Sequence, residues 1–307
     1  VSAGRDRSTI LLLPGLHFLG PDDRRFRRLA AVLAATGAEV VAPYLSDFLG
    51  LRLTPRLIAE AEAALLVASE RGPVSVMSIS FGSIAAFHLA AKYPERIKRM
   101  VVFGGYRNLE LSFRFALGGA IAGVPAQVRD PLNGPAVVAN LVEDMLPEAQ
   151  ADAFRAAALA FSRRTWSRDG AIQDKHDGRH LKVGAEIAAS LEGDAAHLFR
   201  VAARLEGNPL DVVDAVFERA RGRFAFLDPT PLMGRIEAPV ACVHGRDDDV
   251  IPWSESVAMA RDLRNGSAYI TGLYGHTGRA NGAAAGALVR ELRAMAGVID
   301  AMASLAG

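Results

Sequence analysis

The sequence predicts an α/β protein with a mostly parallel, doubly wound sheet and one long helical insertion. Short apolar runs alternate with helix-forming runs over the first 105 residues, and the alternation resumes after about residue 238. Between these parts, residues 107–234 read as mostly helical. Strands that alternate with helices predict parallel strands, right-handed crossovers and helices on both faces of the sheet. We therefore expect a core of residues 1–106 and 235–307 and an inserted helical lid or cap at 107–234.

The elements of the first part follow from apolar runs and from the residues that end them. Residues 8–14 are continuously apolar, as in a strand covered on both faces. Thr54 is suited to cap a helix and Pro55 to occupy its first position. The remaining expected elements are helices at 24–36, 55–69 and 83–91 and strands at 39–43, 74–78 and 99–103.

The insertion is interrupted by several Pro and Gly residues and carries eight of the fourteen Phe residues of the chain. The simpler interpretation is that these rings pack the inserted helices onto the core. The alternative is that some of them face a substrate pocket. After the insertion we expect strands at 238–244 and 267–271 and helices at 253–263 and 283–303.

Composition excludes several classes of function. The formal net charge is +1, so there is no electrostatic case for binding nucleic acid or an anionic membrane. Cys242 is the one cysteine, which excludes an intrachain disulfide and a site of several cysteines around a metal; its apolar surroundings predict a buried, unreactive thiol. The apolar runs have the length of strands, so no transmembrane helix is expected. We expect a cytoplasmic protein, although a chain that starts at Val1 without Met leaves open a removed leader.

The segment Ser78-Ile79-Ser80-Phe81-Gly82 lies between a strand-like run and a helical run. This context suits a nucleophile elbow, in which a serine occupies a sharp turn between a strand and a helix. The residues two before and two after the nucleophile must then be small. Only Ser80 of the three nearby serines meets this condition. The residue two before Ser78 is Val76 and the residue two before Ser83 is Phe81, and both are too large. Ser80 is therefore the candidate nucleophile.

A serine hydroxyl needs a general base, usually His, which a carboxylate orients. In open α/β sheets these groups come from loops at the carboxyl ends of strands, and here the order should be Ser, acid, His. The strand that ends near Val243 is followed by a loop with three aspartates at 247–249. The strand that ends near Thr271 is followed by Gly275-His276.

With these three segments in order, the chain resembles the α/β-hydrolase family over about residues 8–106 and 235–290. The insertion occupies the position of the family's lid. The family's Gly-x-x-Asp-x-x-Val-Pro pattern implies Asp248 as the acid, with Asp247 and Asp249 as alternatives, and implies His276 as the base. His244 is expected to be structural and His88 to pack in the helix after the elbow.

An oxyanion intermediate needs two backbone N–H donors. Phe81 should supply one at the helix N-terminus, where the helix dipole also helps. The other should come from the loop Pro14-Gly15-Leu16-His17, with Leu16 as the first choice by position and His17 as the alternative. This loop lacks the His-Gly usual in the family, and Ser78 replaces the commoner Gly.

The sequence therefore predicts a serine hydrolase of carboxylic esters or thioesters with a Ser80–Asp248–His276 triad, an oxyanion hole at Phe81 and Leu16, and no cofactor or metal. The expected partner is a small molecule with an apolar acyl group, held in part by residues of the insertion and by His17. An acyltransferase or a non-hydrolytic lyase with the same triad is the alternative, because a fold does not fix a reaction. A non-enzymatic binding protein on the same scaffold is a third hypothesis. Substrate identity and oligomeric state are left open.

Overall fold

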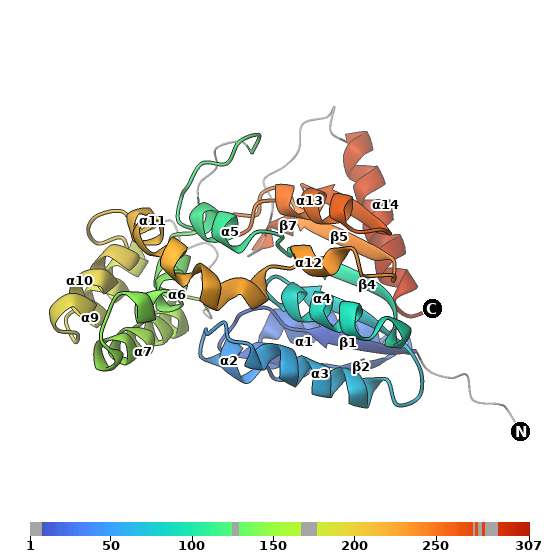
Figure 1. The fold of residues 1–307 in the computed structure, drawn as a ribbon. Coiled ribbons are helices and arrows are strands. Elements are labelled where there is room, and N and C mark those ends of the chain that lie inside the picture. Colours follow the sequence, from blue (N-terminus) through green and yellow to red (C-terminus); the bar gives the residue numbers. More distant parts are fainter. Residues whose placement is uncertain (1–7, 125–128, 167–176, 273, 276–277, 280–287) are drawn as a thin grey trace, which may run out of the picture.

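The computed structural model describes residues 8–124, 129–166, 177–272, 274–275, 278–279 and 288–307. Six parallel strands form the central sheet in the order β2-β1-β3-β4-β5-β6 (Figure 1). Strands β7 and β8 form a separate two-stranded antiparallel sheet. The strands are β1 (Thr9–Leu13), β2 (Glu39–Val41), β3 (Val74–Ile79), β4 (Ile97–Phe103), β5 (Val240–Gly245), β6 (Gly266–Thr271), β7 (Tyr274–Gly275) and β8 (Gly278–Arg279).

The strand order shows the doubly wound topology that the sequence predicts. The chain starts at β1 near one edge, adds β2 at that edge, and then builds β3 to β6 in the other direction. The helices that belong to this core are α1 (Arg24–Ala34), α2 (Ser46–Leu49), α3 (Arg56–Ala68), α4 (Gly82–Lys92), α13 (Ser254–Asp262) and α14 (Leu288–Ser304). The short helix α2 is absent from the sequence-based expectation.

Alternate residues of each strand enter two different apolar clusters. Leu11 and Val76 pack with α3, α4 and α13, whereas Leu12 and Met77 pack with α1 and α14. This separation is the period of two that a strand imposes on its side chains. Both faces of the sheet are thus covered, which explains why the first strand is apolar throughout.

Between β4 and β5 the described chain contains only helices. They are α5 (Leu109–Ala116), α6 (Gly134–Ala139), α7 (Glu148–Thr165), α9 (Arg179–Ala188), α10 (Gly193–Ala202), α11 (Pro209–Ala220) and α12 (Thr230–Met233), with the 3-10 turns η3 (Pro131–Asn133), η4 (Val142–Asp144) and η5 (Arg221–Leu227). Figure 1 shows α6, α7, α9 and α10 gathered at one end of the sheet. These four helices enclose an apolar cluster of their own.

The Phe residues between β4 and β5 serve mainly to pack helices. Phe154 and Phe161 both make edge contacts with Phe199 inside the separate cluster, and all three are fully buried. Phe217 stacks on Phe224 in the cluster that continues into the sheet core. Of the eight Phe residues, Phe113 alone is among the residues that line the pocket described below. Most of these rings thus pack helices, as in the simpler interpretation, but Phe154, Phe161 and Phe199 pack the helices against one another and not onto the sheet core.

Two further expectations concern single residues. The structure begins α3 at Arg56 with Pro55 at the N-cap, one residue later than predicted; the hydroxyl of Thr54 still accepts a hydrogen bond from the N–H of Arg56 at 3.3 Å. Cys242 is buried as predicted, and burial raises the pKa of its thiol to about 12, which disfavours the reactive thiolate. In the part of the chain that the structure describes, the helices are too short or too polar to span a bilayer.

Candidate active site

Ser80 lies directly after β3 and before α4, at the carboxyl end of a middle strand of the sheet. Its backbone φ is +51°, a left-handed conformation that is uncommon for a residue with a side chain. The turn is fixed by two backbone hydrogen bonds: the N–H of Ser80 donates to the carbonyl of Phe103 at 2.8 Å, and its carbonyl accepts from Ser83 at 3.0 Å. A strained turn that is held in place in this way often marks a functional residue.

The small residues around Ser80 are required by close backbone contacts. A Cβ atom on Gly82 would lie 2.4 Å from the carbonyl oxygen of Pro14, a distance that no real side chain tolerates. A Cβ on Gly15 would lie 3.2 Å from the Cβ of Ser80. The loop after β1 therefore packs directly against the elbow. Ser78 is fully buried, so the position two before Ser80 has little room as well.

Three backbone N–H groups beside Ser80 are candidates for binding an oxyanion. They belong to Phe81, Leu16 and His17, and all three residues line the same pocket as Ser80. In the described part of the chain none of these N–H groups donates a hydrogen bond to another group. Phe81 is buried and Leu16 and His17 are half-buried, and unpaired N–H groups in such surroundings are suited to an external acceptor. The geometry does not separate Leu16 from His17, so both stay candidates beside Phe81.

Asp248 lies in the loop after β5, and its side chain is 2% exposed. Its Oδ1 atom accepts hydrogen bonds from the N–H groups of Val250 at 2.9 Å and Ile251 at 2.8 Å. These bonds hold the carboxylate in a tight turn. Of the alternative acids, Asp247 is exposed, and Asp249 is buried with its carbonyl facing the N–H of Asp130 at 3.5 Å.

The side chain of His244, at the end of β5, contacts the loop that carries Asp248. Its Nε2 atom lies 3.0 Å from the carbonyl oxygen of Ile251 and 3.2 Å from Oδ2 of Asp248, and its Nδ1 atom lies 2.8 Å from the hydroxyl of Ser256. A carbonyl oxygen only accepts, so Nε2 must carry a proton. His244 is fully buried and does not line the pocket, in agreement with a structural role.

The other candidate histidines occupy different surroundings. His276 lies outside the described residues, so its predicted place beside Ser80 stays a prediction. His88 lies on α4, where its Nε2 atom pairs with the carbonyl oxygen of Phe226 at 2.8 Å. It therefore ties the helix after the elbow to η5, as expected of a packing residue.

A pocket of about 560 Å³ opens at Ser80. This volume is in the range of sites for small organic molecules. Most of its wall is apolar, with Leu16, Phe81, Phe113, Ala116, Leu132, Ala136, Val137, Trp166 and Val250 among the lining residues. Several of these residues belong to the helical segment between β4 and β5, so this segment contributes to the wall beside Ser80.

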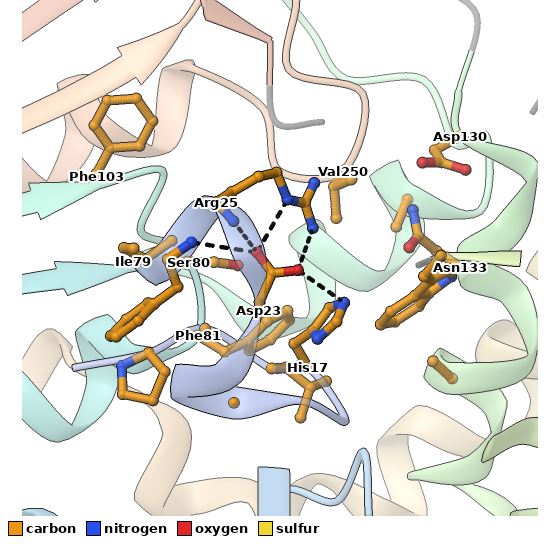
Figure 2. Close-up of a pocket in the computed structure, with 18 of the residues that line it drawn as sticks. His17, Asp23, Arg25, Ile79, Ser80, Phe81, Phe103, Asp130, Asn133 and Val250 are labelled. Atoms are coloured by element: carbon orange, nitrogen blue, oxygen red, sulfur yellow. Dashed lines mark hydrogen bonds and ion pairs between the residues drawn. The ribbon is translucent and has the colours of Figure 1, made fainter. Parts of the chain in front are cut away.

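One part of the pocket wall is polar, and Figure 2 shows it beside Ser80. Asp23 caps α1 by accepting hydrogen bonds from the N–H groups of Arg25 and Phe26, and the guanidinium of Arg25 pairs with the same carboxylate at 3.2 Å. The Nε2 atom of His17 lies 3.8 Å from Oδ2 of Asp23. His17 thus belongs to the pocket, as the sequence analysis suggested.

The pKa values of His17 and Asp23 are both shifted downwards. Burial lowers the pKa of His17 to about 4, and the attraction of Asp23 offsets this only in part. For Asp23 burial acts in the opposite direction, but the hydrogen bond and charge of Arg25 outweigh it and leave the pKa below its usual value. Near neutral pH His17 is therefore uncharged and Asp23 is ionised.

Sequence reasoning missed several residues that line the pocket: Asp23, Arg25, Asn133 and Trp166. Asp23 could have been found, because an Asp directly before a helical run is a typical N-cap. Asn133 and Trp166 give no such signal. They come to the pocket through the packing of η3 against the end of α7, where the indole N–H of Trp166 donates to the carbonyl of Leu132.

Comparison of the whole chain with known proteins gives distant structural similarities only. No protein-family profile and no curated protein sequence matches the chain. The solved structures that it resembles include a protein of Mycobacterium tuberculosis H37Rv described as a candidate non-heme bromoperoxidase, with 18% identity, coverage of 98% of this chain and 93% of that one, and a TM-score of 0.48.

Two others are 2-hydroxy-6-oxo-6-phenylhexa-2,4-dienoate hydrolase from Rhodococcus sp. strain RHA1 (15% identity, coverage 96% and 90%, TM-score 0.46) and the α/β-hydrolase enzyme MGS-M2 from a Medee basin deep-sea metagenome library (13% identity, coverage 99% and 91%, TM-score 0.46). The assignment of the fold rests on the strand order and on the strained serine turn after β3. On these features the chain has the α/β-hydrolase fold.

Proposed function

We propose that the protein is a serine hydrolase of carboxylic esters or thioesters. The observation that carries this proposal is the left-handed turn at Ser80, which presents a hydroxyl at the wall of a largely apolar pocket. Maintaining such a turn has an energetic cost, and a nucleophile elbow gives it a purpose. The unpaired N–H groups beside Ser80 support acyl chemistry in particular, because a tetrahedral oxyanion needs such donors.

In the proposed mechanism His276 accepts the proton of the Ser80 hydroxyl while the serine oxygen attacks the acyl carbon. Asp248 orients His276 and stabilises its positive charge. The N–H of Phe81, with that of Leu16 or His17, holds the oxyanion. His276 then gives its proton to the departing alcohol or thiol. A water molecule, deprotonated by His276, attacks the acyl-enzyme and releases the acid.

The surroundings of Asp248 support its assignment over Asp247, while Asp249 is buried as well. The carboxylate of Asp248 is buried and held by two backbone N–H groups, whereas the side chain of Asp247 is exposed. Val250, two residues further along the same loop, lines the pocket. The loop that carries Asp248 therefore contributes to the wall of the pocket at Ser80.

We also propose that residues 107–234 form a lid or cap over a core of residues 1–106 and 235–307. The separate apolar cluster of α6, α7, α9 and α10 supports this division. Phe113, Leu132 and Trp166 support a role for the lid in holding the substrate, since all three line the pocket at Ser80. A mostly apolar wall suits an acyl or alcohol group of low polarity.

Labelling with a fluorophosphonate probe tests the nucleophile directly. Wild-type protein should be labelled at Ser80, and Ser80→Ala should abolish labelling and reduce kcat on p-nitrophenyl esters by about 10⁶, as for other serine triads. Ser83→Ala is the matched control, because Ser83 is also buried and lies three residues away on α4. A Ser80→Ala variant with near-normal turnover would exclude this mechanism.

A further inference from the structure

Two buried side-chain nitrogen atoms of the pocket wall have no hydrogen-bond partner within the described chain. They are Nε2 of His17 and Nδ2 of Asn133, and both residues line the pocket that contains Ser80. Buried polar atoms are nearly always hydrogen-bonded in folded proteins. Unpaired donors in the wall of a pocket therefore point to an acceptor that is supplied by the bound molecule.

The donor character of His17 follows from its other ring nitrogen. The N–H of Leu19 donates to Nδ1 of His17 at 3.1 Å, so Nδ1 is an acceptor and Nε2 carries the proton of the neutral ring. Stacking on Phe18, with ring centroids 4.6 Å apart, and a tilted contact with Trp166 at 5.9 Å fix the orientation of the ring. Nε2–H is thus held in one direction.

Trp166 connects His17 to the segment that carries Asn133. Its ring contacts His17, while its indole N–H donates to the carbonyl of Leu132 at 3.4 Å, the residue directly before Asn133. The turn η3 is fixed by Asp130, whose Oδ1 accepts from the N–H of Leu132 at 2.9 Å. Figure 2 shows His17 and Asn133 as parts of one pocket wall with Ser80.

The charges next to these donors indicate what kind of acceptor fits. The carboxylate of Asp23 lies 3.8 Å from Nε2 of His17, and the buried carboxylate of Asp130 lies close to Asn133 in sequence and lines the same pocket. A carboxylate or phosphate of the bound molecule would be repelled by Asp23 and Asp130, although Arg25 offsets part of the charge of Asp23 and Arg204 part of that of Asp130. An uncharged oxygen avoids this repulsion. A hydroxyl oxygen suits the site further, because it accepts from His17 and donates to Asp23.

We propose that His17 and Asn133 form a second polar subsite, which binds an uncharged hydroxyl or keto oxygen of the substrate at a distance from the scissile carbonyl. The preferred substrates are then oxo- or hydroxyacyl esters or thioesters rather than plain alkanoyl ones. This inference rests on the proposed function, since the subsite selects among the substrates that Ser80 attacks.

Turnover of a series of p-nitrophenyl esters tests the subsite. The series comprises octanoate, oxo-octanoates with the keto group at each position from the fourth carbon on, the matching hydroxyoctanoates, and a dicarboxylic monoester. The best oxo or hydroxy ester should exceed octanoate in kcat/KM by about tenfold, the value of one well-placed hydrogen bond. The monoester should fall below octanoate because of Asp23 and Asp130.

Variants then assign the preference to its residues. His17→Phe keeps an aromatic ring for stacking, and Asn133→Leu keeps a similar size; each should bring the ratio of the best oxygen-bearing ester to octanoate close to one. His197→Phe is the control, because the side chain of His197 is 67% exposed and distant in the fold, on α10; it should keep the wild-type ratio. Circular dichroism shows whether each variant folds.

Binding to the Ser80→Ala variant separates this inference from the proposed function. Calorimetry with the same series as primary amides should give tighter binding of an oxo or hydroxy amide than of octanamide, whether or not the wild type hydrolyses esters. Equal binding across the series, or an unchanged preference in both His17→Phe and Asn133→Leu, would overturn the subsite. Absence of ester turnover and of fluorophosphonate labelling would instead overturn the serine mechanism.

Discussion

The Nε2 atom of His244 lies 3.2 Å from Oδ2 of Asp248, in a site where neither side chain is more than 2% exposed. His244 also pairs with the carbonyl of Ile251 and the hydroxyl of Ser256. A buried carboxylate is costly unless hydrogen bonds compensate it. The strand that precedes the acid loop therefore supplies the group that fixes the proposed catalytic acid, four residues before it in the sequence.

His244→Leu should destabilise the fold by about 2–4 kcal/mol, because it leaves Oδ2 of Asp248 and the carbonyl of Ile251 without this donor. It should also lower kcat/KM by roughly a hundredfold, since a displaced Asp248 would no longer orient the proposed base His276. Urea denaturation and ester kinetics measure the two effects. Ser256→Ala, which removes only the outer partner, should have a much smaller effect on kcat/KM. Equal kinetics of wild type and His244→Leu would contradict a positioning role.

Asp248→Asn should reduce kcat by about 10⁴, because it cannot stabilise a protonated base; it keeps the oxygen that accepts from Val250 and Ile251, but its NH2 group faces the N–H of His244 in place of Oδ2, so some stability should also be lost. Asp247→Asn and Asp249→Asn provide matched controls in the same loop and should stay within a few-fold of the wild type. Ester kinetics on the three variants decide among them. A larger loss for Asp249→Asn than for Asp248→Asn would reassign the acid.

Gly82→Ala should disrupt the elbow, since the added Cβ would lie 2.4 Å from the carbonyl oxygen of Pro14. We expect a loss of stability of about 2–3 kcal/mol, as for other overpacked sites, together with loss of fluorophosphonate labelling. Gly222→Ala is the control, because no described atom outside its immediate neighbours lies within 4 Å of the position that the added methyl group would take, and the turn η5 tolerates Ala. Thermal denaturation compares the two. Similar melting temperatures for both variants would show that the loop after β1 yields easily.

Ser78→Ala should be neutral or stabilising by up to about 1 kcal/mol, because the Ser78 hydroxyl is buried and lacks a hydrogen-bond partner in the described structure. Fluorophosphonate labelling should be retained, because the proposed nucleophile is Ser80. Urea denaturation and labelling on the same sample give both readings. A clear destabilisation would mean that the hydroxyl has a favourable interaction at this position.

The sequence predicted the sheet and the serine turn well because both depend on local patterns. Apolar runs located all six strands of the sheet within a few residues, and the small residues around Ser80 reflect backbone contacts that the structure contains. The polar part of the pocket could not be predicted in the same way. Trp166 contacts His17 and donates to the carbonyl of Leu132, next to Asn133, through the packing of elements far apart in the sequence, and no local spacing encodes these contacts.

Acid should destabilise the protein through His17. The pKa of His17 is about 4 in the folded protein, against 6.5 for a solvent-exposed histidine, because burial disfavours its charged form. Between these two values the unfolded chain binds a proton that the folded protein does not, so stability falls as the pH is lowered through this window and no further below it. The full loss from this group is on the order of 3 kcal/mol.

His17→Gln removes this titration and should therefore flatten the dependence of stability on pH. Other groups titrate in the same window, so the informative quantity is the difference in the free energy of unfolding between wild type and variant, measured by urea denaturation from about pH 4 to pH 7. The difference should change in favour of the variant as the pH falls. His197→Gln, at an exposed position, should give a constant difference. Parallel curves for wild type and His17→Gln would show that His17 takes up its proton as readily in the folded protein as in the unfolded chain.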